Sequence, residues 1–251
     1  MHTDTNRRDI SYAPTDTGDL YPDTDGKPMA ASDLHLEILI WLLQALRAYF
    51  AAMPDTYVSG DILTYYTEGN PRDVVAPDVL ISFGIGKKRR HTYKVWEEGK
   101  VPDFVMEFSS KTTYQNDLTD KKALYAALGI PNYLLYDAEA LYLSSPLMGF
   151  RLVEGVYVPM QIGDDGRIHS DVIGLDFVIQ ENRLRVYDPI GGEWLQTPAE
   201  AHAARAEREA SKRQQQRARA ETAEARAETA EAEVERLREQ LARLQARRSG
   251  R

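Results

Sequence analysis

Apolar side chains recur at helical spacing between residues 34 and 53. They return every three or four positions, at Leu36, Leu39, Ile40, Leu43, Leu46 and Phe50. This spacing gathers them on one face of an α-helix, which is the pattern of a helix that packs on a core. Ser32 or Asp33 stands before the stretch as a candidate N-cap, and Pro54 ends it.

Beyond Pro54 the pattern changes to short runs of β-branched and aromatic residues, which are typical of strands. We predict strands over residues 56–66, 78–84, 104–110 and 132–137, and a helix over 116–129. From residue 141 to 195, short strands alternate with turn signals, which predicts a β-meander beside the sheet. The order helix, three strands, helix, strand therefore predicts an α/β fold with a mixed central sheet, flanking helices and a β-rich flank.

The last segment carries the seven-residue sequence ARAETAE twice without change, at residues 218–224 and 225–231. Continuing this register places apolar residues alternately three and four positions apart, at Ala220, Ala223, Ala227, Ala230, Val234, Leu237, Leu241 and Leu244. The heptad pattern predicts a C-terminal coiled-coil helix and a homodimer. A single solvated helix stays open as the alternative, because an alanine stripe buries little area.

Composition divides the chain into three parts. Residues 1–28 are rich in Asp, Thr, Gly and Pro and have almost no aliphatic side chains, which predicts a flexible arm. We place a folded domain at 29–196 and the helical coiled-coil tail at 197–251. Residues 1–196 hold 18 Lys and Arg against 29 Asp and Glu, a net charge of −11. Such a domain repels polyphosphate at long range, so generic nucleic-acid binding is disfavoured.

The composition also excludes several kinds of protein. There is no cysteine, which rules out disulfides, thiolate zinc sites and cysteine nucleophiles and favours a cytoplasmic location. The longest apolar run, residues 36–43, is far shorter than the roughly 20 residues of a membrane span. We therefore expect no association with a membrane.

Two carboxylates stand on predicted strands. Asp78 opens one strand directly after Pro77, and Glu107 lies among the apolar residues of another. An ionised carboxylate in such a strand is costly unless it is paired or bound to a metal. Two carboxylates on adjacent strands would form an oxygen-rich site suited to Mg²⁺ or Mn²⁺. Structural pairing of Glu107 with a Lys or Arg stays open as the alternative.

The helix after Glu107 adds a third group. Asp117, Lys121 and Tyr125 are spaced four residues apart and therefore share one helix face. From that face Lys121 could reach the carboxylates and orient a water or stabilise the charge of a phosphorane. The alternative is a surface Asp–Lys pair of little energetic weight.

In combination these motifs resemble the Uma-type family of restriction endonucleases, a branch of the PD-(D/E)XK nuclease superfamily. The resemblance spans roughly residues 30–190. It rests on Pro77, Asp78, Glu107, Ser110, Thr113, Asp117, Lys121, Tyr125, Gly129, Pro131 and Tyr133. The resemblance implies a nuclease-like core in which Asp78 and Glu107 ligate metal and Lys121 is the catalytic lysine.

Several further residues are candidates for accessory roles. Lys111 replaces a proline common in the family and could compete with Lys121. Glu37 and His35, on the first helix, could reach the site, because related nucleases often place an extra carboxylate there. A purely structural role stays open as the alternative for both residues. A basic run, residues 87–91, is a candidate loop beside the active site that contacts DNA phosphates through Lys87, Lys88, Arg89 and Arg90. The alternative for this run is a solvated loop that offsets the surrounding acidic charge.

Two functional hypotheses follow. The first is a metal-dependent endonuclease, in which water activated by Mg²⁺ or Mn²⁺ attacks a DNA phosphodiester with help from Lys121. The second is a catalytically silent binding or adaptor module that keeps the fold and assembles through its coiled coil.

Overall fold

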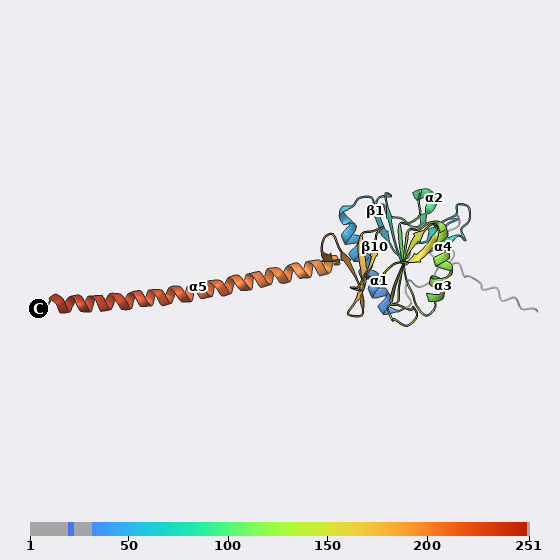
Figure 1. The fold of residues 1–251 in the computed structure, drawn as a ribbon. Helices are drawn as coiled ribbons and strands as arrows, with labels where there is room; N and C mark the ends of the chain where they lie inside the picture. Colours follow the sequence, from blue (N-terminus) through green and yellow to red (C-terminus); the bar gives the residue numbers. More distant parts are fainter. Residues whose placement is uncertain (1–19, 23–31, 250–251) are drawn as a thin grey trace, which may run out of the picture. The chain divides into compact units, whose positions relative to one another are not determined.

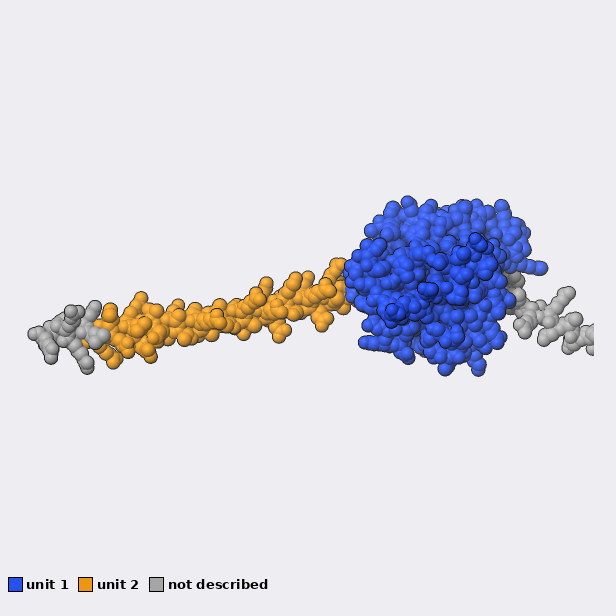
Figure 2. All heavy atoms as spheres, viewed as in Figure 1, with its two compact units in different colours: residues 1–198 blue, residues 199–251 orange. Residues whose placement is uncertain are grey.

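A computed structural model of the protein describes residues 20–22 and 32–249, the last six of them by their backbone alone. The chain forms two compact units, residues 1–198 and 199–251 (Figure 2). Most of the predicted flexible arm lies outside the described residues. Within it Tyr21 packs its ring edge-on against Tyr65, and its hydroxyl accepts a hydrogen bond from the backbone of Gly69. This part of the arm is therefore held against the domain.

A six-stranded sheet forms the centre of the first unit, in the order β1-β4-β6-β7-β8-β9 (Figure 1). Its strands are β1 (Thr56–Ser59), β4 (Val79–Phe83), β6 (Phe104–Phe108), β7 (Asn132–Tyr136), β8 (Leu147–Val153) and β9 (Val156–Pro159). Only β6 and β7 run parallel, because a helical crossover joins them; every other neighbouring pair is antiparallel. The predicted α/β fold with a mixed sheet is confirmed.

Two smaller sheets flank this one. One consists of β10 (Ile168–Ser170), β11 (Leu175–Gln180), β12 (Arg183–Asp188) and β13 (Glu193–Trp194), and the other of β2 (Thr64–Tyr65), β3 (Val74–Val75) and β5 (Tyr93–Lys94). The predicted meander over 141–195 is therefore wrong in one respect, because β8 and β9 extend the main sheet. The predicted strand 56–66 is also two strands, since the chain turns at Gly60 and Asp61, whose φ is 50°.

The two faces of the main sheet are covered by different elements. The helices are α1 (Asp33–Tyr49) with the 3₁₀ turn η1 (Phe50–Ala52), α2 (Val95–Glu98), α3 (Tyr114–Leu118), α4 (Asp120–Leu128) and α5 (Pro198–Ser249). On one face Ile81, Met106 and Leu134 pack in a core with α1 and with β11 and β12. On the other, Leu80 and Val105 pack with Tyr125 of α4. Because side chains alternate along a strand, every second residue of β4 and β6 faces α4.

Helix α1 is the described helix whose length and hydropathy, taken with η1, would also suit a membrane span. Its inward side chains are buried in the core, at Ile38, Leu39, Leu42, Ala45 and Leu46. Core packing therefore accounts for its apolar character. The predicted N-cap is confirmed at Ser32, whose side chain accepts a hydrogen bond from the backbone N–H of His35 at 3.2 Å.

The predicted helix 116–129 is in fact two helices. The backbone of Thr119, with φ −118° and ψ −84°, interrupts the helical turn between α3 and α4. Asp117 therefore belongs to α3, whereas Lys121 and Tyr125 belong to α4. The predicted end is confirmed at Gly129, whose φ of 83° is readily adopted only by glycine.

The second unit is the long helix α5, of 52 residues. Its described side chains are exposed from Arg205 to Arg243, including Val234, Leu237 and Leu241 of the heptad stripe. The predicted C-terminal helix is confirmed. Its pairing with a second copy stays a prediction.

Gly60 lies against the backbone of Asp78 and leaves no room there for a side chain. A Cβ at this position would collide with the Asp78 carbonyl oxygen and would lie 2.7 Å from Leu43 Cδ1. We expect Gly60→Ala to lower the free energy of unfolding by about 1–3 kcal/mol in chemical denaturation. Gly163→Ala is the control, because its Cβ would be crowded by the movable side chain of Asp165, at 2.8 Å, and would meet the Arg167 carbonyl oxygen at an ordinary contact distance of 3.7 Å. Equal stability of both variants would contradict this role of Gly60.

Candidate active site

Asp78 and Glu107 meet at one end of the main sheet. Strands β4 and β6 are antiparallel, with Val79 opposite Met106. Asp78, one residue before Val79, therefore lies beside Glu107, one residue after Met106. Strand alternation turns Glu107 to the same face as Val105, which is the face that α4 covers.

The Glu107 carboxylate is almost completely buried, with 1% of the residue exposed, and both of its oxygens have partners. The Tyr125 hydroxyl donates to Oε1 at 2.5 Å, and Lys121 Nζ lies 2.9 Å from Oε2. Lys121 Nζ also lies 3.2 Å from Asp117 Oδ1, and Ser109 donates to Asp117 Oδ2 at 3.0 Å. The structure thus brings the predicted Glu107, Asp117, Lys121 and Tyr125 into one buried cluster.

Asp78 lies beside this cluster and is held by the neighbouring strand. Its Oδ2 accepts a hydrogen bond of 2.6 Å from the backbone N–H of Phe108. Its Oδ1 faces His35 Nε2 of α1 at 3.9 Å, and 17% of the Asp78 side chain is exposed. Asp78 therefore connects the α1 side of the sheet end to the Glu107 cluster, and solvent reaches it.

The site holds more negative than positive charge, and this moves the pKa values of its groups. Burial is the main cause that raises the pKa of Glu107 to about 8; Lys121 opposes the shift, and Asp78 and Asp117 add to it. For Lys121, burial lowers the pKa, but the carboxylates of Glu107 and Asp117 outweigh this and raise it above its ordinary range. Lys121 stays charged, and a further cation would find a favourable field.

The donor atoms at this end of the sheet fit a divalent metal ion. Among the residues that the structure describes, no group of three or more acidic or histidine side chains is arranged to hold a metal ion as it stands, so the fit rests on the types of donor present. Asp78 and Glu107 are nevertheless neighbours on adjacent strands, and the buried His35 Nε2 near Asp78 has no hydrogen-bond partner in the described part of the chain. Oxygen donors with one imidazole suit Mn²⁺ and, through the oxygens, Mg²⁺.

The other accessory candidates lie apart from the cluster. Glu37 is exposed on α1, and Lys111 is exposed in the turn after β6; neither makes an ion pair within the described ranges. Lys122, the neighbour of Lys121, lies over the Phe150 ring, 3.7 Å from its centroid. Of the lysines near Glu107, Lys121 is therefore the one that contacts it.

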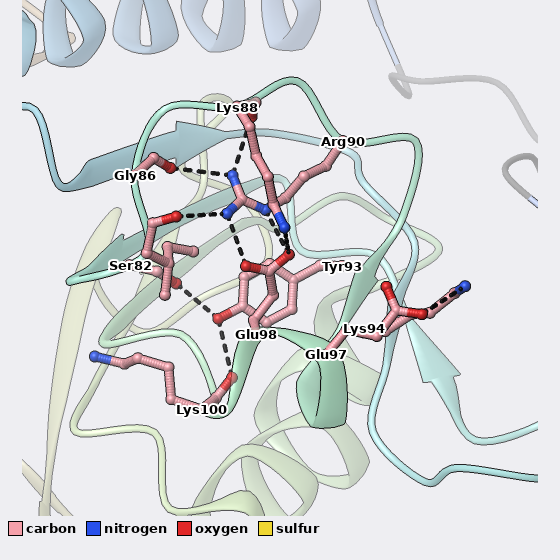
Figure 3. A network of polar contacts seen from close by, with 10 residues as sticks. Ser82, Gly86, Lys88, Arg90, Tyr93, Lys94, Glu97, Glu98 and Lys100 are labelled. Carbon is pink, nitrogen blue, oxygen red and sulfur yellow. Dashed lines mark hydrogen bonds and ion pairs between the residues drawn. The ribbon is translucent and has the colours of Figure 1, made fainter.

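The basic run 87–91 follows β4, whereas Asp78 precedes it. The five-residue strand β4 separates the two by about 16 Å, so the run is not beside the carboxylates. Arg90 donates to both Glu98 oxygens, at 2.8 and 2.7 Å, and to backbone carbonyls of its own loop (Figure 3). Lys87 donates to the carbonyls of Phe50 and Ala51, in η1.

Lys88 and Arg89 of the same run are more available. Lys88 is 63% exposed along its side chain, although its ammonium lies 3.3 Å from Glu98, and Arg89 is exposed. With Arg47 and residues of β1 the run lines an open pocket of about 620 Å³. Contact of Lys87, Lys88, Arg89 and Arg90 with DNA phosphate stays a prediction, at a distance from the site.

The sequence patterns gave no role to two residues that complete the site. Ser109 donates to Asp117, and Tyr133 donates to the Asp117 backbone carbonyl at 2.9 Å. Strand alternation carries a signal for Ser109, because it stands two residues after Glu107 and so points to the same face. Both residues hold Asp117, which in turn holds Lys121.

The comparison with protein families decides the affiliation of the chain. The model of the Uma2 family, whose description is "Putative restriction endonuclease", matches residues 21–217. The chain belongs to the Uma2 family. A search of curated proteins finds no match. Among solved structures, a "putative nuclease belonging to DUF820" from Anabaena variabilis is similar at a TM-score of 0.40 and 14% identity, over 53% of this chain and 70% of that one.

The raised pKa of Glu107 makes the stability of this Uma2-family chain depend on pH. Between the ordinary pKa of 4.5 and the folded value of about 8, the unfolded chain loses its proton while the folded chain keeps it. The contribution to stability is therefore present below 4.5 and is lost as the pH rises to about 8. Urea denaturation in EDTA should show wild type losing stability relative to Glu107→Gln as the pH rises from 5 to 8.

The control for this measurement is Glu37→Gln, which removes an exposed carboxylate from α1. It should follow wild type across the same pH range. A difference between wild type and Glu107→Gln that is constant from pH 5 to 8 would contradict the assignment.

Proposed function

We propose that this chain is a metal-dependent endonuclease that hydrolyses DNA phosphodiester bonds at Asp78, Glu107 and Lys121. The observation that carries the proposal is the buried contact of Lys121 with Glu107 and Asp117, directly beside the solvent-accessible Asp78. Membership of a family described as restriction endonucleases supports the reaction class. The family description names neither a substrate nor a metal; we propose DNA as the substrate and Mg²⁺ or Mn²⁺ as the cofactor.

Asp78 and Glu107 would hold the metal ion through their carboxylate oxygens. A bound Mg²⁺ or Mn²⁺ supplies a nucleophilic water and polarises the phosphoryl oxygen. Tyr125 donates to Glu107 Oε1 and so restrains the orientation of that carboxylate. The backbone N–H of Phe108 does the same for Asp78. Both oxygen ligands are thus oriented before substrate arrives, which is the requirement for electrostatic preorganisation.

Lys121 would act on the phosphate itself. Its ammonium stays charged because the carboxylates of Glu107 and Asp117 outweigh its burial, so it presents a fixed positive charge at neutral pH. As negative charge grows on the phosphorane, this ammonium stabilises it. The hydrogen bond from Ser109 to Asp117 holds the partner of Lys121 in place. A lysine oriented in this way need not reorganise during the reaction.

The central test is cleavage of DNA by the purified full-length protein with Mg²⁺ or Mn²⁺. Glu107→Ala and Lys121→Met should each lower the cleavage rate by at least about 100-fold, because each removes a charge from the reacting centre. Lys122→Met is the matched control and should keep activity, since Lys122 lies over the Phe150 ring and does not contact Glu107.

Equal cleavage by wild type and Glu107→Ala would show that another site or a contaminant cuts the DNA. No cleavage by any variant with either metal would favour the catalytically silent binding module instead. Calorimetric titration with Mn²⁺ then separates the two readings, because a silent module should show no Asp78-dependent binding.

For the tail we propose a parallel homodimer formed through the heptad stripe of α5. Val234, Leu237 and Leu241 are exposed in the single chain, and pairing with a second copy would bury them. Two apolar heptads and an alanine stripe bury little area, so the helix alone should associate only weakly. In a dimer two copies of the site would be present together, which suits cleavage of both DNA strands. We propose a cytoplasmic location for this assembly.

Light scattering on two proteins tests the dimer. The full-length chain should be at least dimeric, and truncation after Pro198 should lower the oligomeric state while the domain stays folded. Replacing Leu237 and Leu241 by Lys in the full-length chain should have the same effect as truncation. If the full-length and truncated proteins both run as monomers, α5 is a single charged helix.

A further inference from the structure

His35 is a buried histidine whose outer ring nitrogen, Nε2, has no hydrogen-bond partner among the described residues. It lies in the first turn of α1, and its ring packs against Phe108 with centroids 5.2 Å apart. Only 9% of its side chain is exposed, and within the described residues Nε2 makes no hydrogen bond. Leaving a buried polar atom unsatisfied is costly, so such an atom points to a group that binds there.

The free nitrogen faces Asp78. His35 Nε2 and Asp78 Oδ1 are 3.9 Å apart, which is too long for a hydrogen bond. The other Asp78 oxygen is already bound to the backbone of Phe108. The separation lies within the sum of two ordinary metal–ligand bonds of about 2.1 Å each. The nitrogen and the oxygen are therefore close enough to bind one metal ion together.

The neighbouring residues do not offer a replacement for this nitrogen. Glu37, two positions further along α1, is exposed. Both Glu107 oxygens contact Tyr125 and Lys121, so Glu107 has less capacity left for a metal than an unpartnered carboxylate. A third donor would compensate for this, and His35 is the group that the fold places next to Asp78.

We propose that His35 Nε2 is a direct ligand of the divalent ion held by Asp78 and Glu107, and that it makes the site prefer Mn²⁺ to Mg²⁺. The inference rests on the proposed function, whose metal site it completes. Imidazole nitrogen binds transition-metal ions well, whereas Mg²⁺ strongly prefers oxygen. His35 therefore sets which ion the site selects.

The test is electron paramagnetic resonance of Mn²⁺ bound to the full-length protein. Wild type should bind Mn²⁺ with the hyperfine signature of a coordinated imidazole nitrogen. His35→Ala and His35→Gln should lose this signature, and their Mn²⁺ affinity should fall about 10–100-fold. Mg²⁺ affinity, measured by competition, should fall less. His169→Ala is the control, because the His169 ring contacts Asp176 at 2.6 Å and lies outside the cluster.

The outcomes separate this inference from the proposed function. If Mn²⁺ binds to wild type and is lost in Glu107→Ala, but no nitrogen coupling is seen, the His35 ligand is wrong and the metal site stands. Coupling that survives in His35→Ala also overturns the inference. If no Glu107-dependent Mn²⁺ binding occurs at all, the metal-dependent function fails and His35 fails with it. Even if a variant does not fold, the wild-type spectrum shows whether a nitrogen ligand is bound to Mn²⁺.

Discussion

The burial of one carboxylate, Glu107, is the constraint on which the rest of the site depends. A charge in the middle of an apolar strand requires partners, and the strand face it occupies dictates where they come from. Lys121 and Tyr125 must both lie on the helix that covers this face, which fixes the rotation of α4 on the sheet. The tyrosine ring also packs edge-on against Tyr133 of β7. The position of α4 on the sheet is therefore set both by the charge of Glu107 and by the packing of Tyr125.

The spacing of Asp117, Lys121 and Tyr125 was enough to predict their shared cluster, although the predicted single helix is broken. The interruption at Thr119 leaves Asp117 and Lys121 one turn apart, so the i, i+4 neighbours still meet at 3.2 Å. Local geometry of this kind can be predicted from the sequence, because it involves one short segment. The same helical spacing explains why Lys121, and not its neighbour Lys122, faces Glu107.

Positions set by long-range contacts were harder to predict. Nothing in the sequence around His35 shows that the first turn of α1 lies against the start of β4. The two strands β8 and β9 carry the same turn signals as the later ones, yet they pair with β7 and with each other in the main sheet. The basic run was predicted beside the active site, which is wrong. The predicted strand itself shows this, because Asp78 precedes β4 and Lys87 follows it, so the two lie toward opposite ends of the strand.

The excess of negative charge connects the metal and the substrate. Once Glu107 is ionised, as metal binding requires, Asp78, Glu107 and Asp117 face the single ammonium of Lys121, so without the metal charge these carboxylates repel a phosphodiester more than Lys121 attracts it. The basic run lies at the far end of β4, and its Arg90 is already paired with Glu98. It is therefore too distant to offset the negative potential at the carboxylates. Under the proposed function a divalent cation is therefore needed to admit the substrate as well as to activate water. The negative charge of these three carboxylates would then explain both why the site binds a metal ion and why the substrate enters only when that ion is bound.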